Sequence, residues 1–556
     1  MALSLAPAFH CPAPLARLRP ASVTATTTRP AVSRPSTPPP ILRQGIAAEP
    51  GALCSNALQC SGCSHETALD CPPLLSEAKK FFVRHGISDL SFDSGLLWGW
   101  RCRAKLAVRG SAKEPMVGLY EEGSHNVVDI PFCKAHHPSI NAAVELLKQG
   151  IALFNVQPYD EDSGTGELRY VQMAVTTYDT SVPASERYLK GKVQISLVWN
   201  SRSEKSPGVE KADALSGVSL WLNLSNYLFG VLFNQFLWRK GGQNSSYHLI
   251  HSVWMNFQTS STNVIFGHRW RHMIGEKDLW EHVGGIDISL APSSFGQANT
   301  KVAIADCDWS RVTFFHIFVQ AFDSLLHKLQ KYVPVGENVV DLYAGAGVIG
   351  LSLAVTRNCR TVKCLEVNKE AKLSFERSIS RLPKSFSGNI SWHHTDVAME
   401  PLYWLEGSDV VVVDPPRKGL HPSLIEALQK LPSSSKKAVQ MTGSSSTRKR
   451  EEKRPWVLQA REACAELNNS SIDKGQSWPH TIIYISCGWE SFKKDCDSLV
   501  SSKIWRLEKA HAFNFFPGTK SIEILAVFKR GGLSSQKEKK KKKAGKRKGS
   551  SKERSL

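Results

Sequence analysis

The sequence predicts an α/β protein whose C-terminal half contains a parallel, doubly wound sheet. A helix is expected at residues 312–329, followed by a strand at 338–343, a glycine-rich turn, another helix and a strand at 361–367. Strands that alternate with helices are typical of βαβ units, which build parallel sheets. Later apolar runs predict further strands of the same sheet, at residues 409–413, 481–486 and 521–528.

The stretch before this sheet predicts a separate α+β domain. Short strands are expected between residues 96 and 117, and alternating runs at 193–199 and 263–267 indicate more β-structure. Residues 218–238 carry no charge, but Asn and Gln interrupt them and leucines recur every four residues. This pattern indicates a buried helix of a folded domain and not a membrane span.

The predicted domain order follows from these elements and from the composition between them. With 556 residues, 42% of them hydrophobic, the chain is long enough for two or three folded units. We expect a disordered leader (1–48), a cysteine-bearing segment (49–83), the α+β domain (84–290), the doubly wound domain (291–530) with a flexible Ser- and Lys-rich insertion (433–478), and a disordered Lys-rich tail (531–556).

The first 48 residues have the composition of an organelle transit peptide. They are rich in Ser, Thr, Ala and Pro, they contain five Arg, and the first acidic residue of the chain is Glu49. The Pro-rich run at 38–40 fits an amphipathic mitochondrial presequence poorly, so a chloroplast address is favoured over a mitochondrial one. A disordered tail without a targeting role is the simpler alternative.

The net charge of +20 favours a polyanionic partner, although much of it lies at the two ends. The leader contributes five positive charges, and residues 537–554 contribute eleven Lys or Arg against two Glu, so the folded body retains about +6. Basic residues of the predicted strands are candidates for contact with a nucleic-acid backbone: Arg101, Arg103, Lys105 and Arg109. A solvated strand face explains their spacing equally well.

A glycine-rich turn at residues 341–350 predicts a nucleotide-like ligand. The sequence Asp-Leu-Tyr-Ala-Gly-Ala-Gly-Val-Ile-Gly follows a predicted strand and opens a helix, so Gly345 and Gly347 let the backbone approach a ligand. Glu366 ends the next strand, where an acid can accept hydrogen bonds from ribose hydroxyls. A lone glycine pattern arises often by chance, but here strand, helix and acid occur in the expected order.

Two further strand ends carry residues suited to catalysis. The strand at 409–413 is followed by Asp414-Pro415-Pro416-Arg417, where the prolines fix the exit of the chain beside the ligand crevice. The strand at 481–486 is followed by Cys487. In a parallel sheet all these strand ends lie on one edge, so the sequence predicts that the thiol faces the ligand.

Together these motifs resemble the RNA uracil-C5 methyltransferase family, which includes bacterial 23S ribosomal RNA and transfer RNA enzymes. The resemblance extends over about residues 54–530 and includes Phe-Gly-Gln-Ala-Asn at 295–299 and Phe-Pro-Gly-Thr-Lys-Ser-Ile-Glu at 516–523. It implies a C-terminal Rossmann-like methyltransferase domain that uses S-adenosylmethionine to methylate C5 of a uridine in RNA, and a chain that acts as a monomer.

The resemblance also assigns roles to individual residues. Uracil C5 is a poor nucleophile, so the reaction needs a thiolate to add at C6, which the resemblance assigns to Cys487, and a base to remove the C5 proton, assigned to Glu523. Asp414 is expected where cofactor and base meet. The cofactor pocket is expected to include Gln297, Tyr343, Gly345, Gly347 and Glu366. An isolated strand cysteine is otherwise a small buried hydrophobe, and an isolated glutamate is usually solvated.

Two positions depart from the family pattern. Gly488-Trp489 stand where the family has Asn-Pro after the cysteine, and Gly296 replaces an aromatic residue. A second hypothesis is therefore a catalytically silent RNA-binding or ribosome-assembly protein that keeps the fold. A third is an α/β methyltransferase acting on an exocyclic nitrogen, which would not need Cys487.

Closely spaced cysteines near the N-terminus predict a metal centre. Cys54, Cys60 and Cys63 form a soft ligand set suited to zinc or an iron–sulfur cluster. Spacing favours Cys71 as the fourth ligand, whereas the family resemblance favours Cys133 and a [4Fe-4S] cluster, which is our preferred prediction. Because cluster-bearing relatives include ribosomal RNA enzymes, ribosomal RNA is favoured over transfer RNA as the substrate.

Overall fold

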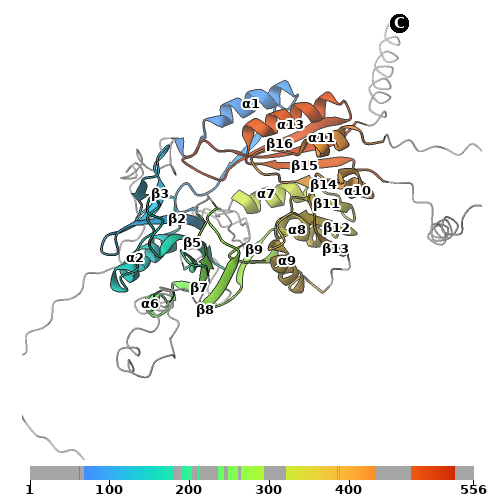
Figure 1. Ribbon diagram of the computed structural model, residues 1–556. Helices are drawn as coiled ribbons and strands as arrows, with labels where there is room; N and C mark the ends of the chain where they lie inside the picture. The colour runs from blue at the N-terminus through green and yellow to red at the C-terminus, as the bar shows by residue number, and fades with distance from the viewer. Residues whose placement is uncertain are drawn as a thin grey trace, which may run out of the picture. The chain divides into compact units, whose positions relative to one another are not determined.

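A computed structural model of the chain contains two large β-sheets (Figure 1). The structure describes residues 68–179, 190–202, 236–242, 248–260, 264–293, 321–384, 388–432 and 477–531, together with isolated positions at 62, 187, 209, 211 and 386. The predicted leader, the insertion and the tail lie almost entirely outside these residues, as do Cys54, Cys60, Cys63 and Gln297.

The larger sheet has eight strands in the order β1-β16-β17-β15-β14-β11-β12-β13. Five adjacent strands, from β15 to the edge strand β13, are mutually parallel. They are β11 (Asn338–Leu342), β12 (Thr361–Glu366), β13 (Asn389–His394), β14 (Val410–Val413) and β15 (Thr481–Ser486). Three strands complete it: β17 (Glu523–Arg530), antiparallel to both neighbours, β16 (Trp505–Asn514), and β1 (Ser91–Ser94), parallel to β16. The predicted α/β fold is confirmed.

Helices cover both faces of this sheet. One group packs on one face: α7 (Ala321–Gln330), α8 (Val348–Thr356) and α9 (Ala371–Ser380). The other group packs on the opposite face: α1 (Leu74–Arg84), α10 (Pro401–Leu405), α11 (Pro422–Gln429) and α13 (Trp489–Ser501). Successive strand residues alternate between the two cores, so Val411 and Val413 contact one helix group while Val410 and Val412 contact the other. A sheet buried on both faces explains why its central strands are continuous apolar runs.

The second sheet has seven strands in the order β4-β3-β2-β5-β6-β7-β8. They are β4 (Val127–Asp129), β3 (Pro115–Tyr120), β2 (Arg103–Gly110), β5 (Leu168–Thr176), β6 (Lys192–Trp199), β7 (Ile250–Phe257) and β8 (Arg269–Gly275), antiparallel except for the β6–β7 pair. Helices α2 (Pro138–Leu153) and α6 (Phe236–Lys240) pack on it. The hairpin β9 (Leu279–Val283) and β10 (Ile286–Leu290) contacts α8 and α9.

The strand predicted at 263–267 is wrong for the residues that the structure describes. Residues 264–267 are not in a strand, and β8 begins at Arg269. The Asn256 side chain accepts a hydrogen bond from Gly267 N and donates to the carbonyl oxygens of Gly267 and Arg269. Side-chain bonds thus replace strand pairing for this turn.

Residues 74–94 lie with the eight-stranded sheet, which differs from the expected domain boundary at residue 84. Helix α1 buries Leu75, Ala78, Phe81 and Phe82 in the core that contains α13, and β1 then pairs with β16. The chain enters the seven-stranded sheet only at Arg103. The apolar face of α1 is therefore completed in part by α13, which follows about 400 residues later in the sequence.

Within the described residues no helix has the length and apolar character needed to cross a membrane. Of the uncharged stretch at 218–238, only positions 236–238 are described, and they belong to α6.

Candidate active site

The predicted site residues follow strands that end at one edge of the eight-stranded sheet. Tyr343 follows β11, Asp414 follows β14, Cys487 follows β15, and Glu523 begins the antiparallel β17 at the same edge. In the sheet, β12 lies on one side of β11, whereas β14 lies on the other side of β11. Ligands of doubly wound sheets bind at such a reversal of strand order, so the edge beside Tyr343 and Asp414 is the expected crevice.

The glycine-rich turn has the backbone conformation that its sequence predicts. Tyr343, Gly345 and Gly347 all have positive φ, at 65°, 57° and 78°. No atom lies within 4 Å of a Cβ added at Gly345, whereas one at Gly350 would lie 2.5 Å from Cys364 Sγ. Gly350 therefore lets α8 approach the sheet, and the loop at Gly345 is open, as a cradle for a ligand requires.

Carboxylates on either side of the turn bind its backbone. Glu366 accepts hydrogen bonds from Gly345 N (2.8 Å) and Asn368 N (2.7 Å). Asp341, which is fully buried, accepts one from Gly350 N (2.9 Å) at the start of α8. Burial, together with the charges of Asp414 and Glu366, raises the pKa of Asp341 to about 8, although the hydrogen bond from Gly350 N lowers it. Asp341 is a structural residue of the turn whose role the sequence motif did not reveal.

The Asp-Pro-Pro-Arg loop is fixed by α13. Asp495 of this helix accepts hydrogen bonds from Leu420 N (2.8 Å) and from Tyr484 Oη of β15 (2.6 Å). A Cβ at Gly419 would lie 2.6 Å from Asp495 Oδ2, so the loop requires glycine there, where φ is +85°. Asp495 thereby links the chain after Asp414 to the strand that carries Cys487. No motif in the sequence predicted this role.

Cys487 and Glu523 are brought together by strand register. The β15–β17 ladder ends with Ser486 opposite Ile524, so the same register carried one position further places Cys487 opposite Glu523. Directly opposed residues of an antiparallel pair point to the same face, with Cα atoms about 4.5–5.5 Å apart. The thiol and the carboxylate are therefore neighbours, while Glu523 is buried and Cys487 is half-buried.

Burial and negative neighbours favour the protonated forms of both groups. Burial, and then the charges of Glu523 and Asp414, raise the pKa of Cys487 to about 11, while Arg417 opposes them through its charge and a hydrogen bond to the thiol. Burial, and then Asp414, raise the pKa of Glu523 well above its usual range, again opposed by Arg417. Burial raises the pKa of Asp414 to about 7. Arg417 is thus the positive group at this site, a role that its place in the Asp-Pro-Pro-Arg motif can suggest.

Gly488, which replaces the family's Asn, is required by the neighbouring loop. A Cβ at this position would lie 2.6 Å from Arg417 O and 2.7 Å from Ser491 Oγ. The Ser491 hydroxyl donates to Arg417 O at 2.9 Å. The altered pair is therefore compatible with a closely packed site, in which the Asp-Pro-Pro-Arg loop contacts the first turn of α13.

Of the predicted metal ligands, Cys133 and the alternative Cys71 lie in the described part of the chain. Cys71 is exposed, and Cys133 is half-buried in the loop before α2. The carbonyl oxygen of Cys133 accepts hydrogen bonds from Asn141 Nδ2 (3.0 Å) and His136 N (3.1 Å), which fixes this loop.

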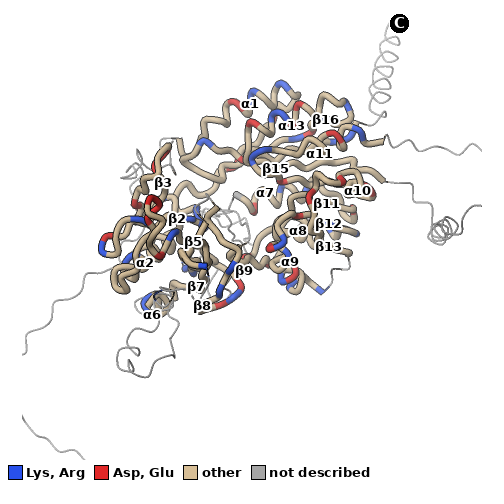
Figure 2. The backbone as a smooth tube through the Cα atoms, viewed as in Figure 1, with Lys and Arg blue, Asp and Glu red and all other residues tan. Residues whose placement is uncertain are grey.

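The predicted basic cluster does not form one exposed surface. Arg109 is buried, pairs with Glu161, and donates to Tyr120 Oη (2.6 Å) and to the carbonyl oxygen of Arg169 (3.0 Å). Burial also lowers the pKa of Arg103, while Lys105 is exposed and lies over the Phe266 ring. Basic and acidic positions are interspersed in this part of the chain (Figure 2). Because Arg109 is buried in internal contacts, the four residues do not form one exposed face.

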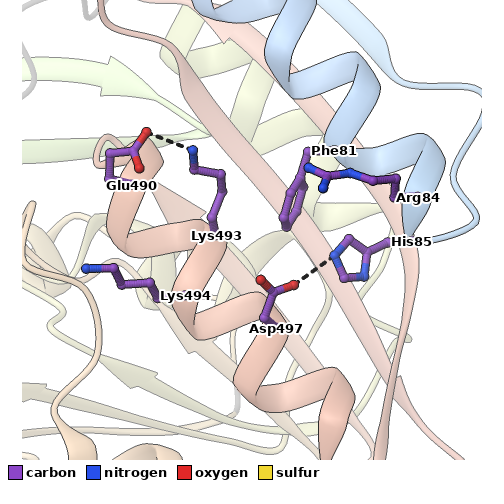
Figure 3. Close-up of a pocket in the computed structure, with 7 residues that line it drawn as sticks. All are labelled: Phe81, Arg84, His85, Glu490, Lys493, Lys494 and Asp497. Carbon is purple, nitrogen blue, oxygen red and sulfur yellow. Dashed lines mark ion pairs between the residues drawn. The ribbon is translucent and has the colours of Figure 1, made fainter.

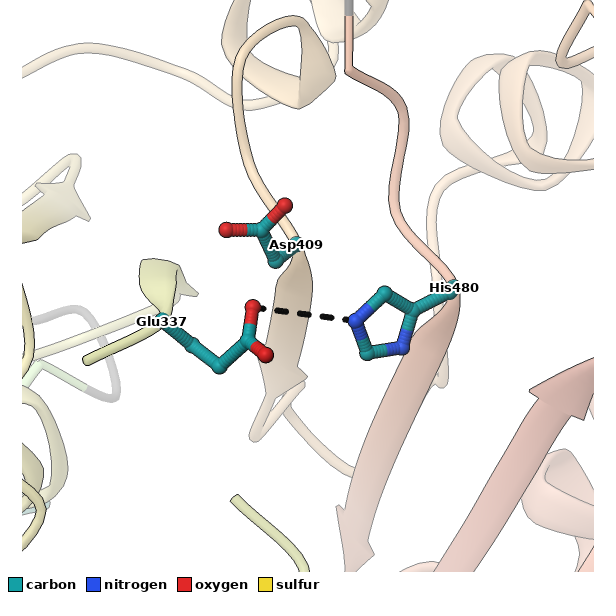
Figure 4. Close-up of side chains that lie close together, drawn as sticks. All are labelled: Glu337, Asp409 and His480. Carbon is teal, nitrogen blue, oxygen red and sulfur yellow. Dashed lines mark ion pairs between the residues drawn. The ribbon is translucent and has the colours of Figure 1, made fainter. Parts of the chain in front are cut away.

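A second group of ionisable side chains lies at the opposite edge of the eight-stranded sheet (Figure 4). Glu337, Asp409 and His480 immediately precede β11, β14 and β15, and their ligand-type atoms lie within 4.8 Å of one another. Burial and the hydrogen-bonded Asp409 raise the pKa of Glu337 to about 7. This group is separated from Cys487 by the length of the strands, so it does not belong to the crevice.

The sequence is similar to one family model and to RNA methyltransferases of bacteria. Residues 311–466 match the family model described as conserved hypothetical protein 95. The chain is 33% identical over 491 residues to an uncharacterized RNA methyltransferase of Protochlamydia amoebophila, covering 88% of this chain and 99% of that one. It is 31% identical over 323 residues to an uncharacterized RNA methyltransferase of Geobacter sulfurreducens, covering 58% and 53%.

A solved structure shares the fold. The Pyrococcus abyssi tRNA (uracil-54, C5)-methyltransferase in complex with S-adenosyl-L-homocysteine superposes with a TM-score of 0.50, at 19% identity and 82% coverage of each chain. The likeness therefore extends over both sheets and is not restricted to the doubly wound one.

Proposed function

The chain belongs to the RNA methyltransferase family, and we propose that it transfers a methyl group from S-adenosylmethionine to C5 of a uridine in RNA, with Cys487 as covalent nucleophile. The observation that carries this proposal is the register of β15 and β17: one position beyond the Ser486–Ile524 pair it sets Cys487 opposite Glu523, whose charge acts on the thiol. A methyltransferase acting on an exocyclic nitrogen needs neither a thiol nor a carboxylate facing it. Carbon methylation of a pyrimidine needs both.

The residues present fit the cofactor. The Gly345 loop is open toward the crevice, and Glu366 lies where an acid reaches ribose hydroxyls. Tyr343 and Asp414 line the same edge, and Gln297 is proposed to complete the pocket. When bound there, S-adenosylmethionine would supply the electrophilic methyl group, and its S–CH3 bond would break to leave S-adenosylhomocysteine.

Side chains of the protein carry out the other steps of the proposed reaction. The Cys487 thiolate forms a bond to C6, the C5=C6 π pair becomes the C4=C5 bond, and the C4=O4 π pair moves to O4 to give an enolate. After C5 has bonded to the methyl carbon, ionised Glu523 takes the C5 proton, the C5=C6 bond re-forms, and the S–C6 bond breaks. Arg417 stabilises the thiolate and the ionised carboxylate, which the geometry otherwise disfavours. The target base has to leave its stack to reach this edge.

RNA containing 5-fluorouridine tests the reaction, because fluorine at C5 cannot be removed as a proton and the adduct persists. We expect a covalent protein–RNA complex that requires S-adenosylmethionine and is lost in Cys487→Ala. A catalytically silent RNA-binding protein would bind this RNA without an adduct. An enzyme acting on an exocyclic nitrogen would methylate RNA with Cys487→Ala still active. Either result overturns the proposal.

We propose a [4Fe-4S] cluster held by Cys54, Cys60, Cys63 and Cys133, and ribosomal RNA as the favoured substrate class. The loop that contains Cys133 is held by hydrogen bonds, which supports Cys133 as the fourth ligand over the exposed Cys71. After anaerobic purification, Cys133→Ser should lose bound iron and sulfide while Cys71→Ser retains them. The reverse result would assign Cys71, and zinc without sulfide would replace the cluster.

We further propose that residues 1–48 direct the protein to the chloroplast. A fusion of this segment to a fluorescent protein should accumulate in plastids, whereas mitochondrial or cytosolic fluorescence would contradict the address. Loss of a 5-methyluridine from organelle ribosomal RNA in a knockout would identify the target nucleotide.

A further inference from the structure

Cys487 lies directly between strand β15 and the N-cap of helix α13. Ser486 is the last residue of β15, Gly488 is the N-cap of α13, and Trp489 is its first helical residue. The position of the thiol therefore depends on where α13 begins. By helix geometry, the N–H groups of the first turn point toward the N-terminal end of α13, which Cys487 immediately precedes, and Gly488 provides no side-chain cap for them.

The first turn of α13 is fixed by a helix from the other end of the chain. Trp489, only 5% exposed, stacks on Phe492 and meets the Phe81 ring of α1 edge-on at 5.4 Å. Its indole Nε1 donates to Glu77 Oε1 at 2.8 Å, and Lys493 Nζ, one turn further along α13, donates to the same oxygen at 2.5 Å. One carboxylate of α1 thus binds two successive turns of α13.

The α1–α13 contact continues beyond Glu77. His85 and Asp497 form an ion pair of 2.9 Å at the far end, and a surface groove of about 240 Å³ runs between the helices (Figure 3). Figure 3 also shows the pair between Lys493 and Glu490. On the opposite side, Arg417 O binds Ser491 Oγ. The turn that follows the thiol is therefore held between α1 and the Asp-Pro-Pro-Arg loop.

We infer that Glu77 is a positioning residue for the reaction: through Trp489 it holds the N-terminus of α13 against Cys487, so that the helix dipole stabilises the thiolate. This inference rests on the proposed role of Cys487. The charged groups facing the thiol are Glu523 and Asp414, which disfavour the thiolate, and Arg417, which favours it. The helix N-terminus adds a second favourable contribution. Trp489 in place of proline supplies the indole N–H that Glu77 binds.

The test is peptide-resolved alkylation of Cys487 by iodoacetamide across a pH series, which needs no RNA. Glu77→Ala should shift the pH profile upward and slow alkylation about 2–5-fold at a given pH, as expected for loss of a helix-terminus interaction. Glu77→Gln should restore the wild-type profile, because its amide oxygen accepts from Trp489 Nε1. Trp489→Phe should behave like Glu77→Ala. Lys494→Met, which alters only the groove, is the matched control.

The outcomes separate this inference from the proposed function. An unchanged profile in Glu77→Ala would overturn the positioning role even if the enzyme methylates uridine. A shifted profile supports it even if no methylation is found. Local unfolding is a distinct third result that also contradicts it, because alkylation of buried Cys496 would then rise together with that of Cys487.

Discussion

Tyr484 of β15 donates a 2.6 Å hydrogen bond to Asp495 of α13, and this buried bond connects the strand before Cys487 with the helix after it. The same carboxylate binds Leu420 N in the loop that follows Asp414. Two segments, β15 and the loop after Asp414, therefore donate to one acceptor on a third, α13. Because buried polar atoms that lose their partners cost about 1–3 kcal/mol each, this acceptor is important for the geometry of the site.

Replacement of Asp495 tests that arrangement. Asp495→Ala leaves both Leu420 N and Tyr484 Oη without an acceptor, so we expect the free energy of unfolding to fall by about 2–4 kcal/mol. Tyr484→Phe removes one donor and leaves the Leu420 bond, so the loss should be about 1 kcal/mol. Urea unfolding followed by tryptophan fluorescence measures both. Equal losses in the two variants would contradict a shared acceptor.

Much of the doubly wound sheet could be predicted because its central strands are apolar on both faces. The runs at 338–343, 361–367 and 481–486 became β11, β12 and β15 within one residue at each end. Strand β13 contains Ser and His, and β16 places Arg506, Glu508 and Lys509 among apolar residues, so neither gave a clear signal. Their pairing partners, distant in sequence, determine that they are strands.

The site residues that could be predicted are those whose chemical type the reaction requires. Cysteine and glutamate are required by the carbon chemistry, and the strand register brings Cys487 and Glu523 into one place. The roles of Asp495, Trp489 and Glu77 depend on contacts between remote segments and could not be predicted. The basic cluster failed because spacing along a strand does not show whether an arginine such as Arg109 already has an acidic partner.

Glu523→Gln should stop the reaction after methyl transfer. An amide cannot take the C5 proton, so the S–C6 bond cannot break and a methylated covalent complex should accumulate on ordinary uridine RNA. We expect turnover to fall by about 10²–10⁴-fold, which is the usual contribution of a general base. Denaturing gels with labelled RNA detect the complex. The double variant with Cys487→Ala should show none, and wild-type turnover in Glu523→Gln would exclude it as the base.

Gly488→Ala should distort the site through the neighbouring loop. The added Cβ would lie 2.6 Å from Arg417 O, so the loop or the first turn of α13 has to move. Such overpacking costs about 1–3 kcal/mol, and displacement of Arg417 should also lower the yield of the 5-fluorouridine adduct. Gly531→Ala is a control, because its nearest atoms lie at an ordinary 3.6 Å. Equal adduct yields in the two variants would show that the close approach at Gly488 is unimportant.

Glu337 should make stability fall as pH rises from about 4.5 to about 7. Its pKa is raised to about 7 in the folded protein by burial and by Asp409, against an ordinary value of 4.5. Between these values the folded chain retains a proton that the unfolded chain releases, so deprotonation favours unfolding. Glu337→Gln removes this titration. The variant should gain stability relative to wild type at pH 8 but not at pH 4, as measured by thermal unfolding at both values. Contributions from groups distant from Glu337 cancel in the difference, so a pH-independent difference would mean that the pKa of Glu337 is not raised in the folded protein.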